Sequence, residues 1–215
     1  MPRDPHGEQP ILVSGAPLAT ARGAMVLLHG RGGSPQDMRE LARTLDRPQF
    51  ACCAPAAAGR TWYPYSFLER IERNEPHLSS ALRLVEEALG RTETAGLPAP
   101  RVVLLGFSQG ACLALEFAAR HARRYGAVVG LSGGLIGPEG TARDYAGSFE
   151  GTPVFLGSSD VDPHVPKRRV DETEAVFTRL GARVTKRIYP GMGHTINADE
   201  IEHVRSLLDA VPAAG

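Results

Sequence analysis

The chain has 215 residues, of which 42% are hydrophobic and 22% are charged, and its formal net charge at pH 7 is zero. This size and composition predict one globular domain spanning residues 1–215, with a flexible, polar and proline-rich start at residues 1–10. The neutral charge balance gives no indication of nucleic acid as a partner, and no apolar run is long enough to predict stable membrane insertion. Three cysteines, two of them adjacent, and a start without a signal-peptide pattern predict a reducing, cytoplasmic location.

Short apolar runs recur along the chain and alternate with segments of helical periodicity. This alternation predicts an α/β fold, in which helices cover both faces of a mostly parallel sheet and little or no cap domain is present. In such folds, functional residues lie at the carboxyl ends of the strands. The runs expected to form strands are residues 11–13, 24–28, 50–54, 102–105, 128–131, 154–156 and 184–189.

Several helices have recognisable boundary residues in the sequence. Ser34 and Pro35 are suited to the N-cap and the first position of one helix. A second helix is expected to begin at Pro76 and to end at Gly90, because glycine commonly terminates helices. Asn197 is expected to cap the last helix of the chain.

The predicted strand at residues 102–105 leads directly into a motif with chemical significance. Residues 106–110 read Gly-Phe-Ser-Gln-Gly, which matches the G-x-S-x-G nucleophile elbow, and a helical pattern follows. Gly106 and Gly110 leave room for the sharp, strained turn that exposes the serine hydroxyl. We therefore expect Ser108 to be a nucleophile.

A serine hydroxyl needs a base to accept its proton, and in this fold the base follows the serine and an acid along the chain. His194 is favoured because it comes last and is preceded by Gly191 and Gly193, which let its loop curl over the sheet. His164 is the alternative, whereas His29 precedes Ser108 and has the wrong order. The remaining histidines are expected at the surface: His6, His77, His121 and His203.

Two aspartates could orient the base. Asp162 is favoured because Pro163 follows it and gives a rigid turn that fixes a carboxylate, whereas Asp160 is expected to cap that turn. A calcium site formed by Asp160, Asp162 and His164 is disfavoured, because the glycine and distal glutamate of a calcium loop are missing. No metal is therefore expected.

An acyl-transfer site also needs two backbone N–H groups that stabilise the oxyanion. One is expected from Gln109, immediately after the nucleophile. The other is expected from Arg31, in the glycine-rich loop of residues 29–33 that follows an earlier strand.

Taken together, these motifs resemble the phospholipase/carboxylesterase family, which includes the acyl-protein thioesterases. The resemblance implies an α/β-hydrolase fold, a triad of Ser108, Asp162 and His194, no cofactor, and hydrolysis of esters or thioesters through an acyl-serine intermediate. The matching blocks are Leu28–Gly30, Gly106–Gly110, Leu131–Gly134, Asp162–Pro166 and Gly191–His194.

Two departures from the thioesterase pattern bear on the substrate. Ala111 stands where the thioesterases have glycine, and Arg31 is more polar than the residue common in lipid-handling members. We therefore expect a small-molecule ester with a short or medium acyl chain. The residues expected to line its pocket, or alternatively to pack a loop as an aromatic cluster, are Trp62, Tyr63, Tyr65 and Phe67, with Met192 nearby.

The sequence leaves several functions open. A serine carboxylesterase is the first, and a lysophospholipase or acyl-protein thioesterase is the alternative within the same chemistry. A non-catalytic small-molecule receptor on a hydrolase fold and a metal-dependent hydrolase belong to other classes. An apolar rim around the aromatic stretch could also support a homodimer.

Overall fold

Within residues 4–213, which the computed structural model describes, seven strands form one sheet in the order β1-β3-β2-β4-β5-β6-β7. Only β1 is antiparallel to its neighbour; every other pair is parallel. The predicted α/β fold with a mostly parallel sheet is confirmed. The strands are β1 (Ile11–Gly15), β2 (Gly23–Leu28), β3 (Phe50–Pro55), β4 (Val102–Phe107), β5 (Ala127–Leu131), β6 (Pro153–Ser159) and β7 (Arg183–Tyr189).

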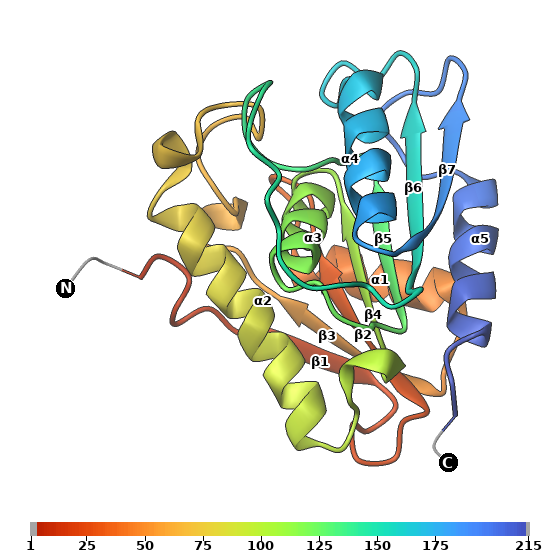
Figure 1. The fold of residues 1–215 in the computed structure, drawn as a ribbon. Coiled ribbons are helices and arrows are strands. Elements are labelled where there is room, and N and C mark those ends of the chain that lie inside the picture. Colours follow the sequence, from red (N-terminus) through yellow and green to blue (C-terminus); the bar gives the residue numbers. More distant parts are fainter. Residues whose placement is uncertain (1–3, 214–215) are drawn as a thin grey trace.

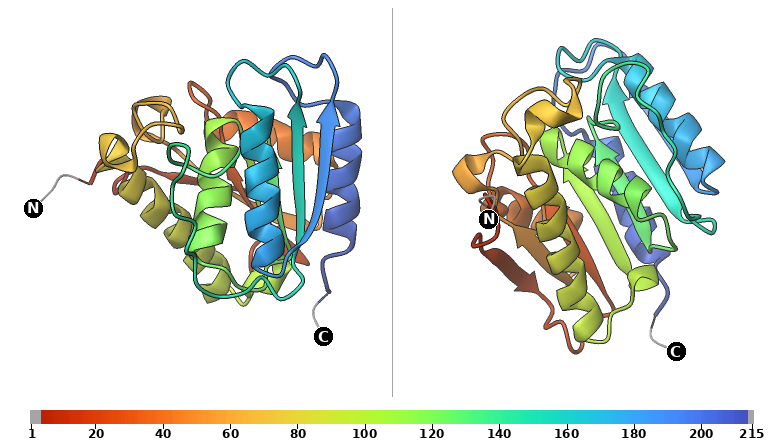
Figure 2. Two further views of the ribbon diagram at one scale, coloured as in Figure 1. Left: turned by 45° about the horizontal axis from the view of Figure 1, so that its top comes forward. Right: turned by 60° about the vertical axis from the view of Figure 1, so that its left-hand side comes forward.

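Helices cover both faces of this sheet (Figures 1 and 2). On one face lie α2 (His77–Thr94), α3 (Gln109–Arg120) and α4 (Lys167–Arg179), and on the other lie α1 (Pro35–Leu45) and α5 (Ala198–Asp209). Each face has its own apolar core. The strands therefore separate two packed layers, as a doubly covered sheet requires.

The central strand β4 contributes to both cores. Val102 and Leu104 pack beneath α2, α3 and α4, whereas Val103 and Leu105 pack on the face of α1 and α5. Side chains alternate along a strand, so a strand buried on both faces must be apolar throughout. This is why the continuous apolar run at residues 102–105 could be assigned to a strand.

Helix α2 is longer than the sequence indicated. It continues through Gly90 to Thr94, and the chain leaves it at Gly96, whose φ is +86°. The prediction that Gly90 ends the helix is wrong, because a glycine in a helix interior weakens the helix without breaking it.

The N-terminal segment also departs from expectation, because His6 is fully buried rather than at the surface. Its Nε2 donates to the carbonyl of Trp62 at 3.0 Å, and its Nδ1 accepts from the N–H of Ala58 at 3.0 Å. The backbone N–H of His6 donates to Ser80 Oγ at 2.8 Å. The expected flexible start therefore does not describe residues 4–10, and residues 1–3 lie outside the described part of the chain.

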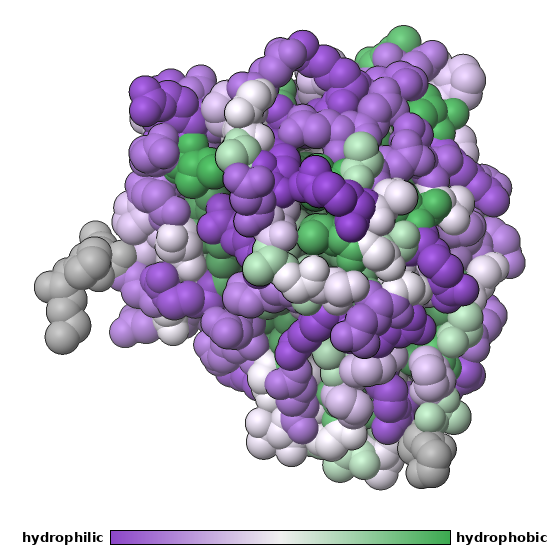
Figure 3. Space-filling view, in the orientation of Figure 1, coloured by the Kyte–Doolittle hydropathy of each residue, from purple (hydrophilic) through white to green (hydrophobic). Residues whose placement is uncertain are grey.

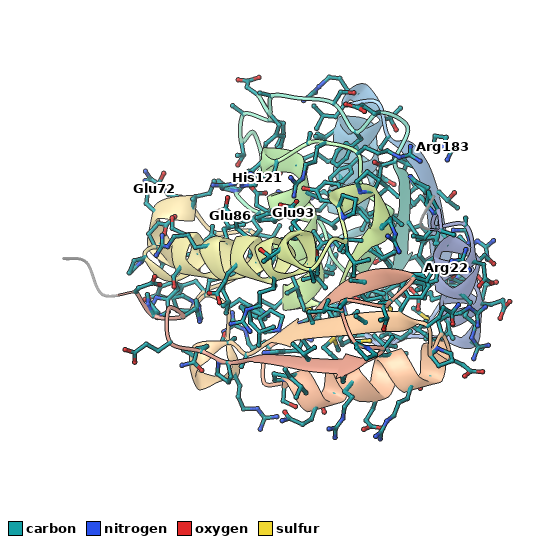
Figure 4. The ribbon with its side chains drawn as sticks, turned by 90° about the horizontal axis from the view of Figure 1, so that it is seen from below. Arg22, Glu72, Glu86, Glu93, His121 and Arg183 are labelled. Carbon is teal, nitrogen blue, oxygen red and sulfur yellow. The ribbon has the colours of Figure 1, made fainter. Side chains whose placement is uncertain are left out.

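The two ends of the sheet differ in character. The arrowheads of β6 and β7 point to the same edge, where long loops gather (Figure 1). At the opposite end, Arg22 lies beside α5 and donates to the carbonyls of Asp209 and Val211 (Figure 4). The loop edge holds the carboxyl ends of the parallel strands, where sites form in such folds, while at the other end hydrogen bonds from Arg22 join the start of β2 to the end of α5.

The face formed by α2, α3 and α4 is mostly hydrophilic, and its apolar side chains lie in separate small patches (Figure 3). Between residues 4 and 213, we find no helix whose length and apolar character would let it cross a bilayer.

Candidate active site

The turn from β4 to α3 has the geometry of a nucleophile elbow. Ser108 has φ of 56° and ψ of −120°, a strained conformation for a residue with a side chain. A Cβ on Gly106 would lie 2.2 Å from the carbonyl oxygen of Gly110, and one on Gly110 would lie 2.1 Å from that of Leu28. Both positions require glycine, and the serine is held at the tip of the turn.

Ser108, His194 and Asp162 come from three loops and form one chain of hydrogen bonds. Ser108 Oγ lies 2.7 Å from His194 Nε2, and His194 Nδ1 lies 2.7 Å from Asp162 Oδ2. A carboxylate only accepts, so Nδ1 carries the imidazole proton and Nε2 is free to accept from the serine. The ring of His194 also packs on that of Phe107, with centroids 5.1 Å apart.

The carboxyl group of Asp162 is satisfied on both oxygens. Oδ1 accepts from the N–H groups of His164 at 2.8 Å and Val165 at 3.1 Å, while Oδ2 faces His194. Burial alone would raise the pKa of Asp162, but these hydrogen bonds outweigh it and hold the pKa below its ordinary value. The carboxylate therefore stays ionised although its side chain is inaccessible to solvent.

The alternative residues occupy different positions. Asp160 is exposed, and its Oδ1 accepts from the N–H of Gly191 at 2.8 Å, so it links the acid loop to the histidine loop. His164 is exposed, and its ring stands edge-on to that of His194 at 4.9 Å. Across residues 4–213, no three His, Cys, Asp or Glu side chains gather in a way that could hold a metal ion.

Two backbone N–H groups are suited to the expected oxyanion role. Gln109 is the first residue of α3, so its N–H has no acceptor within the helix. The N–H of Arg31 donates to no other group among residues 4–213. Its loop lies against the elbow, because a Cβ on Gly30 would be 3.3 Å from that of Ser108.

A cavity of about 460 Å³ opens beside the serine. Three of the predicted pocket residues, Tyr63, Tyr65 and Phe67, line it, but Trp62 and Met192 do not. Trp62 is fully buried and donates its indole N–H to the carbonyl of His29, and the Met192 sulfur accepts from Asn197. The lining consists of Arg31, Tyr63, Pro64, Tyr65, Ser66, Phe67, Ser108, Gln109, Cys112, His164, Val165 and His194.

The side chain of Gln109 fixes one wall of this cavity. Its Oε1 accepts from the N–H of Trp62 at 2.9 Å, and its Nε2 donates to the carbonyl of Tyr63 at 2.8 Å. Sequence reasoning assigned a role only to the backbone of Gln109. The available signal was a long amide followed by the apolar residues 110–115, where a polar side chain needs buried partners.

The side chain of Arg31 holds the same loop from the other side. It donates to three successive carbonyls, those of Tyr63 and Tyr65 at 2.9 Å and Pro64 at 3.1 Å. Only its N–H was expected to be functional. The backbone carbonyls of residues 63–65 are thus bound by two side chains that flank the serine, one from the loop of residues 29–33 and one from the first residue of α3.

Comparison with known proteins gives consistent results. A family model described as phospholipase/carboxylesterase matches residues 14–211. The crystal structure of a phospholipase/carboxylesterase from Dyadobacter fermentans DSM 18053 is 43% identical, covers 94% of this chain and 96% of its own, and superposes with a TM-score of 0.90.

Curated relatives are acyl-protein thioesterases 1. The one from Gibberella zeae is 32% identical over 117 residues, 53% of this chain and 49% of its own length, so this match spans only about half of the relative. The one from Eremothecium gossypii is 27% identical over 219 residues and covers 88% of this chain and 90% of its own. With a family model spanning nearly its whole length, the chain belongs to the phospholipase/carboxylesterase family.

Proposed function

We propose that this chain is a serine carboxylesterase that hydrolyses short- to medium-chain carboxylic esters through an acyl-Ser108 intermediate. The observation that supports this most directly is the pair of 2.7 Å hydrogen bonds that link Ser108 to His194 and His194 to Asp162. A strained serine with an oriented imidazole is the arrangement that nucleophilic acyl transfer requires.

In the proposed reaction, His194 Nε2 takes the proton of Ser108 as Oγ attacks the ester carbonyl. The negative charge that develops on the carbonyl oxygen is stabilised by the N–H groups of Gln109 and Arg31 and by the amino-terminal end of α3. Asp162 stabilises the imidazolium that forms. His194 then protonates the leaving alcohol, and water, deprotonated by the same imidazole, releases the acid and regenerates Ser108.

The cavity supports a substrate of modest size. Its volume of about 460 Å³ lies in the lower half of the range of small-molecule pockets, roughly 300–1,000 Å³. Phe67, Tyr63 and Val165 are buried and offer apolar contact to an acyl chain. The curated name of the relatives makes thioester hydrolysis the second candidate, within the same chemistry.

The first test is labelling with a fluorophosphonate probe, in wild type and in Ser108→Ala. We expect wild type to be labelled and the variant to be unlabelled, with kcat for p-nitrophenyl butyrate lower by about a million-fold. A thermal melt of both proteins controls for folding. Failure to label a folded wild type would contradict the proposal and favour the non-catalytic receptor.

The second test separates the two candidate substrates. A series of p-nitrophenyl esters, matched with thioesters of the same acyl chains, gives kcat/KM against chain length. We expect an optimum at short or medium chains and ester rates at least equal to thioester rates. An optimum at long acyl chains would instead favour a lysophospholipase or an acyl-protein thioesterase.

We further propose a cytoplasmic location and a homodimer. Three unpaired, buried cysteines at residues 52, 53 and 112 suit a reducing compartment. Tyr65 and Val161, which are 46% and 59% exposed, are large apolar side chains available to a second copy. Sedimentation equilibrium of wild type and Tyr65→Ser tests the dimer, and a monomeric wild type would contradict it.

A further inference from the structure

We infer that Arg31 makes this enzyme selective for esters that carry a carboxylate group of their own, besides the ester that is cleaved. The inference rests on the proposed esterase function and narrows its substrate class. It assigns the guanidinium of Arg31, as distinct from its backbone N–H, to substrate recognition.

The guanidinium is fixed at the wall of the cavity. Its three hydrogen bonds run to the carbonyls of residues 63, 64 and 65, so its position is set before a substrate arrives. These bonds use three of the five guanidinium N–H donors, and two remain without an acceptor within residues 4–213. A charged group held in place in this way loses little conformational entropy on binding.

The carbonyl oxygens accept three hydrogen bonds from Arg31 but do not neutralise the positive charge of its guanidinium. Arg31 forms no ion pair with any carboxylate among residues 4–213, whereas the nearby Arg73 is paired with Glu69 at 3.1 Å. An arginine without an acidic partner is common on an open surface, where solvent screens it. Arg31 is itself an exposed residue, but it lines a concave site that also contains the serine.

The remaining lining adds no negative charge. In the described part of the chain, no aspartate or glutamate lines the cavity, and Asp162 is screened behind His194. His164, on the lining, can add positive charge but not negative charge. The amino-terminal end of α3 contributes a further positive potential. A neutral acyl chain gains nothing from this field, whereas a substrate carboxylate gains a charge-assisted hydrogen bond.

The experiment compares matched pairs of substrates. On the acyl side the pair is p-nitrophenyl hexanoate and mono-p-nitrophenyl adipate, which share a six-carbon acyl chain and differ in a terminal carboxylate. The methyl ester of the adipate controls for polarity without charge. On the leaving-group side the pair is phenyl butyrate and p-carboxyphenyl butyrate. The ratio of kcat/KM within each pair is measured for every variant, so that intrinsic reactivity cancels.

Three variants test whether this ratio depends on the charge of Arg31. We expect Arg31→Gln to lower the charged-to-neutral ratio by about three- to tenfold in one of the two pairs, mainly through KM. Arg31→Lys retains the charge but lacks the guanidinium fork that binds residues 63–65, so it should keep more of the ratio than Arg31→Gln does. Arg60→Gln, which removes a neighbouring charge that does not line the cavity, is the matched control and should leave the ratio unchanged. Raising the ionic strength to about 0.5 M should reduce the wild-type preference.

A purely structural role for Arg31 predicts a different result. Loss of the contacts to residues 63–65 alone would lower kcat/KM for charged and neutral esters by the same factor, in Arg31→Lys as well as in Arg31→Gln. Equal ratios in wild type and Arg31→Gln for both pairs would overturn the inference. If the proposed esterase function itself is wrong, the result is distinguishable, because wild type then hydrolyses neither the hexanoate nor the adipate ester.

A measurement on wild type alone covers the case in which Arg31→Gln does not fold. Adipate and hexanoate are compared as competitive inhibitors of ester hydrolysis. We expect adipate to bind at least about threefold more tightly at low salt, with the difference shrinking as salt is added. Equal inhibition constants would contradict the inference without any variant.

Discussion

Asp160 and Asp162, in the loop after β6, position His194 in different ways. Asp162 holds the imidazole directly, and its second oxygen is bound by two backbone N–H groups that prevent it from turning away. Asp160 reaches across to the N–H of Gly191 and sets where the histidine loop begins. Asp162 therefore acts on the ring of His194, and Asp160 acts on the backbone of the loop that carries His194.

Matched substitutions should separate these roles. Asp162→Asn offers the imidazole an amide in place of a carboxylate and favours the wrong tautomer, so we expect kcat to fall by about 10⁴-fold. Asp160→Asn keeps an oxygen that can accept from Gly191, and we expect a loss of less than about fivefold. Both are measured on p-nitrophenyl butyrate after a thermal melt. The reverse ranking would assign the acid to Asp160.

The elements on either side of Ser108 are packed so closely that their contact is made by backbone alone. Gly106 ends the buried part of β4, Gly110 lies in the first turn of α3, and the carbonyl of Leu28 from β2 lies against the helix. No side chain fits between these three segments. The elbow therefore depends on two glycines, whereas Gly90, inside α2, has free space where a Cβ would lie.

Two alanine substitutions should show this difference. Gly106→Ala would place a Cβ 2.2 Å from the Gly110 carbonyl, and we expect it to lower the free energy of unfolding by at least about 2 kcal/mol. Gly90→Ala, inside α2, meets nothing within 4 Å, and we expect a gain of about 1 kcal/mol. Urea unfolding followed by circular dichroism measures both. A stable Gly106→Ala protein would contradict the account of the elbow.

The first turn of α5 contains a buried acid, Glu200, whose pKa lies close to neutral pH. Glu200 is fully buried, and its Oε2 accepts from the N–H of Asn197 at 2.9 Å in a capping box. Burial raises the pKa of Glu200 from 4.5 to about 7. A carboxyl group whose pKa is raised in the fold contributes its full stability at pH values below 4.5, the pKa in the unfolded chain. This contribution is lost as the pH rises from 4.5 through 7.

Replacement of this acid by its amide should remove that loss. Glu200→Gln keeps the cap but cannot ionise, so its free energy of unfolding, relative to wild type, should rise by about 1–2 kcal/mol between pH 5 and pH 8. Urea unfolding at both pH values gives this difference. A difference that is the same at both pH values would mean that Glu200 titrates normally in the fold.

How much the sequence predicts depends on how local its signals are. The apolar run of β4, the capping residue Ser34 and the elbow glycines each act within a few residues, so these elements could be assigned before the structure was seen. The structure also places Ser108, Asp162 and His194, which were expected to act together, within hydrogen-bond distance of one another. The extent of α2 could not be predicted, because several helix-favouring residues outweigh one glycine.

Features that depend on contacts between distant segments were missed. The burial of His6 depends on Ser80, 74 residues away, and no local pattern marks it. The side-chain contacts of Arg31 depend on the path of residues 63–65, which have no regular periodicity. Trp62 was expected in the pocket as part of the aromatic stretch of residues 62–67, but its indole N–H needs a buried acceptor and turns to the carbonyl of His29 instead.

On the scale of the whole molecule, the N-terminal segment supports the active-site loops. The rings of His6 and His29 both lie close to that of Trp62, with centroids 5.8 and 4.8 Å from it. His6 Nδ1 accepts from Ala58 N, and His29 Nε2 accepts from Ala57 N at 3.1 Å. His6, the loop of residues 29–33 and residues 57–62 therefore form one connected unit.

This unit should make the protein sensitive to acid. Burial lowers the pKa values of His6 and His29 from 6.5, so the unfolded chain takes up these protons first as the pH falls. Their stabilisation is complete above 6.5 and is lost as the pH falls from 6.5 towards the lowered folded values. Glu200 titrates in the opposite sense over this range, so the drop is measured in the Glu200→Gln background: the urea midpoint should fall there by about 1 M in urea between pH 8 and pH 5, and by less when His6→Asn is added. An equal drop in the variant would contradict this role for His6.

The same connection determines where the protein can be joined to other molecules. His6, whose imidazole binds the carbonyl of Trp62 next to the pocket, is only two residues from Asp4. Helix α5, in contrast, ends at the end of the sheet opposite the active-site loops (Figure 1). An affinity tag, a surface linker or a fused partner at the amino terminus would pull on the loops that surround the serine. For immobilisation as a biocatalyst, the carboxyl terminus is the attachment point that leaves the pocket undisturbed.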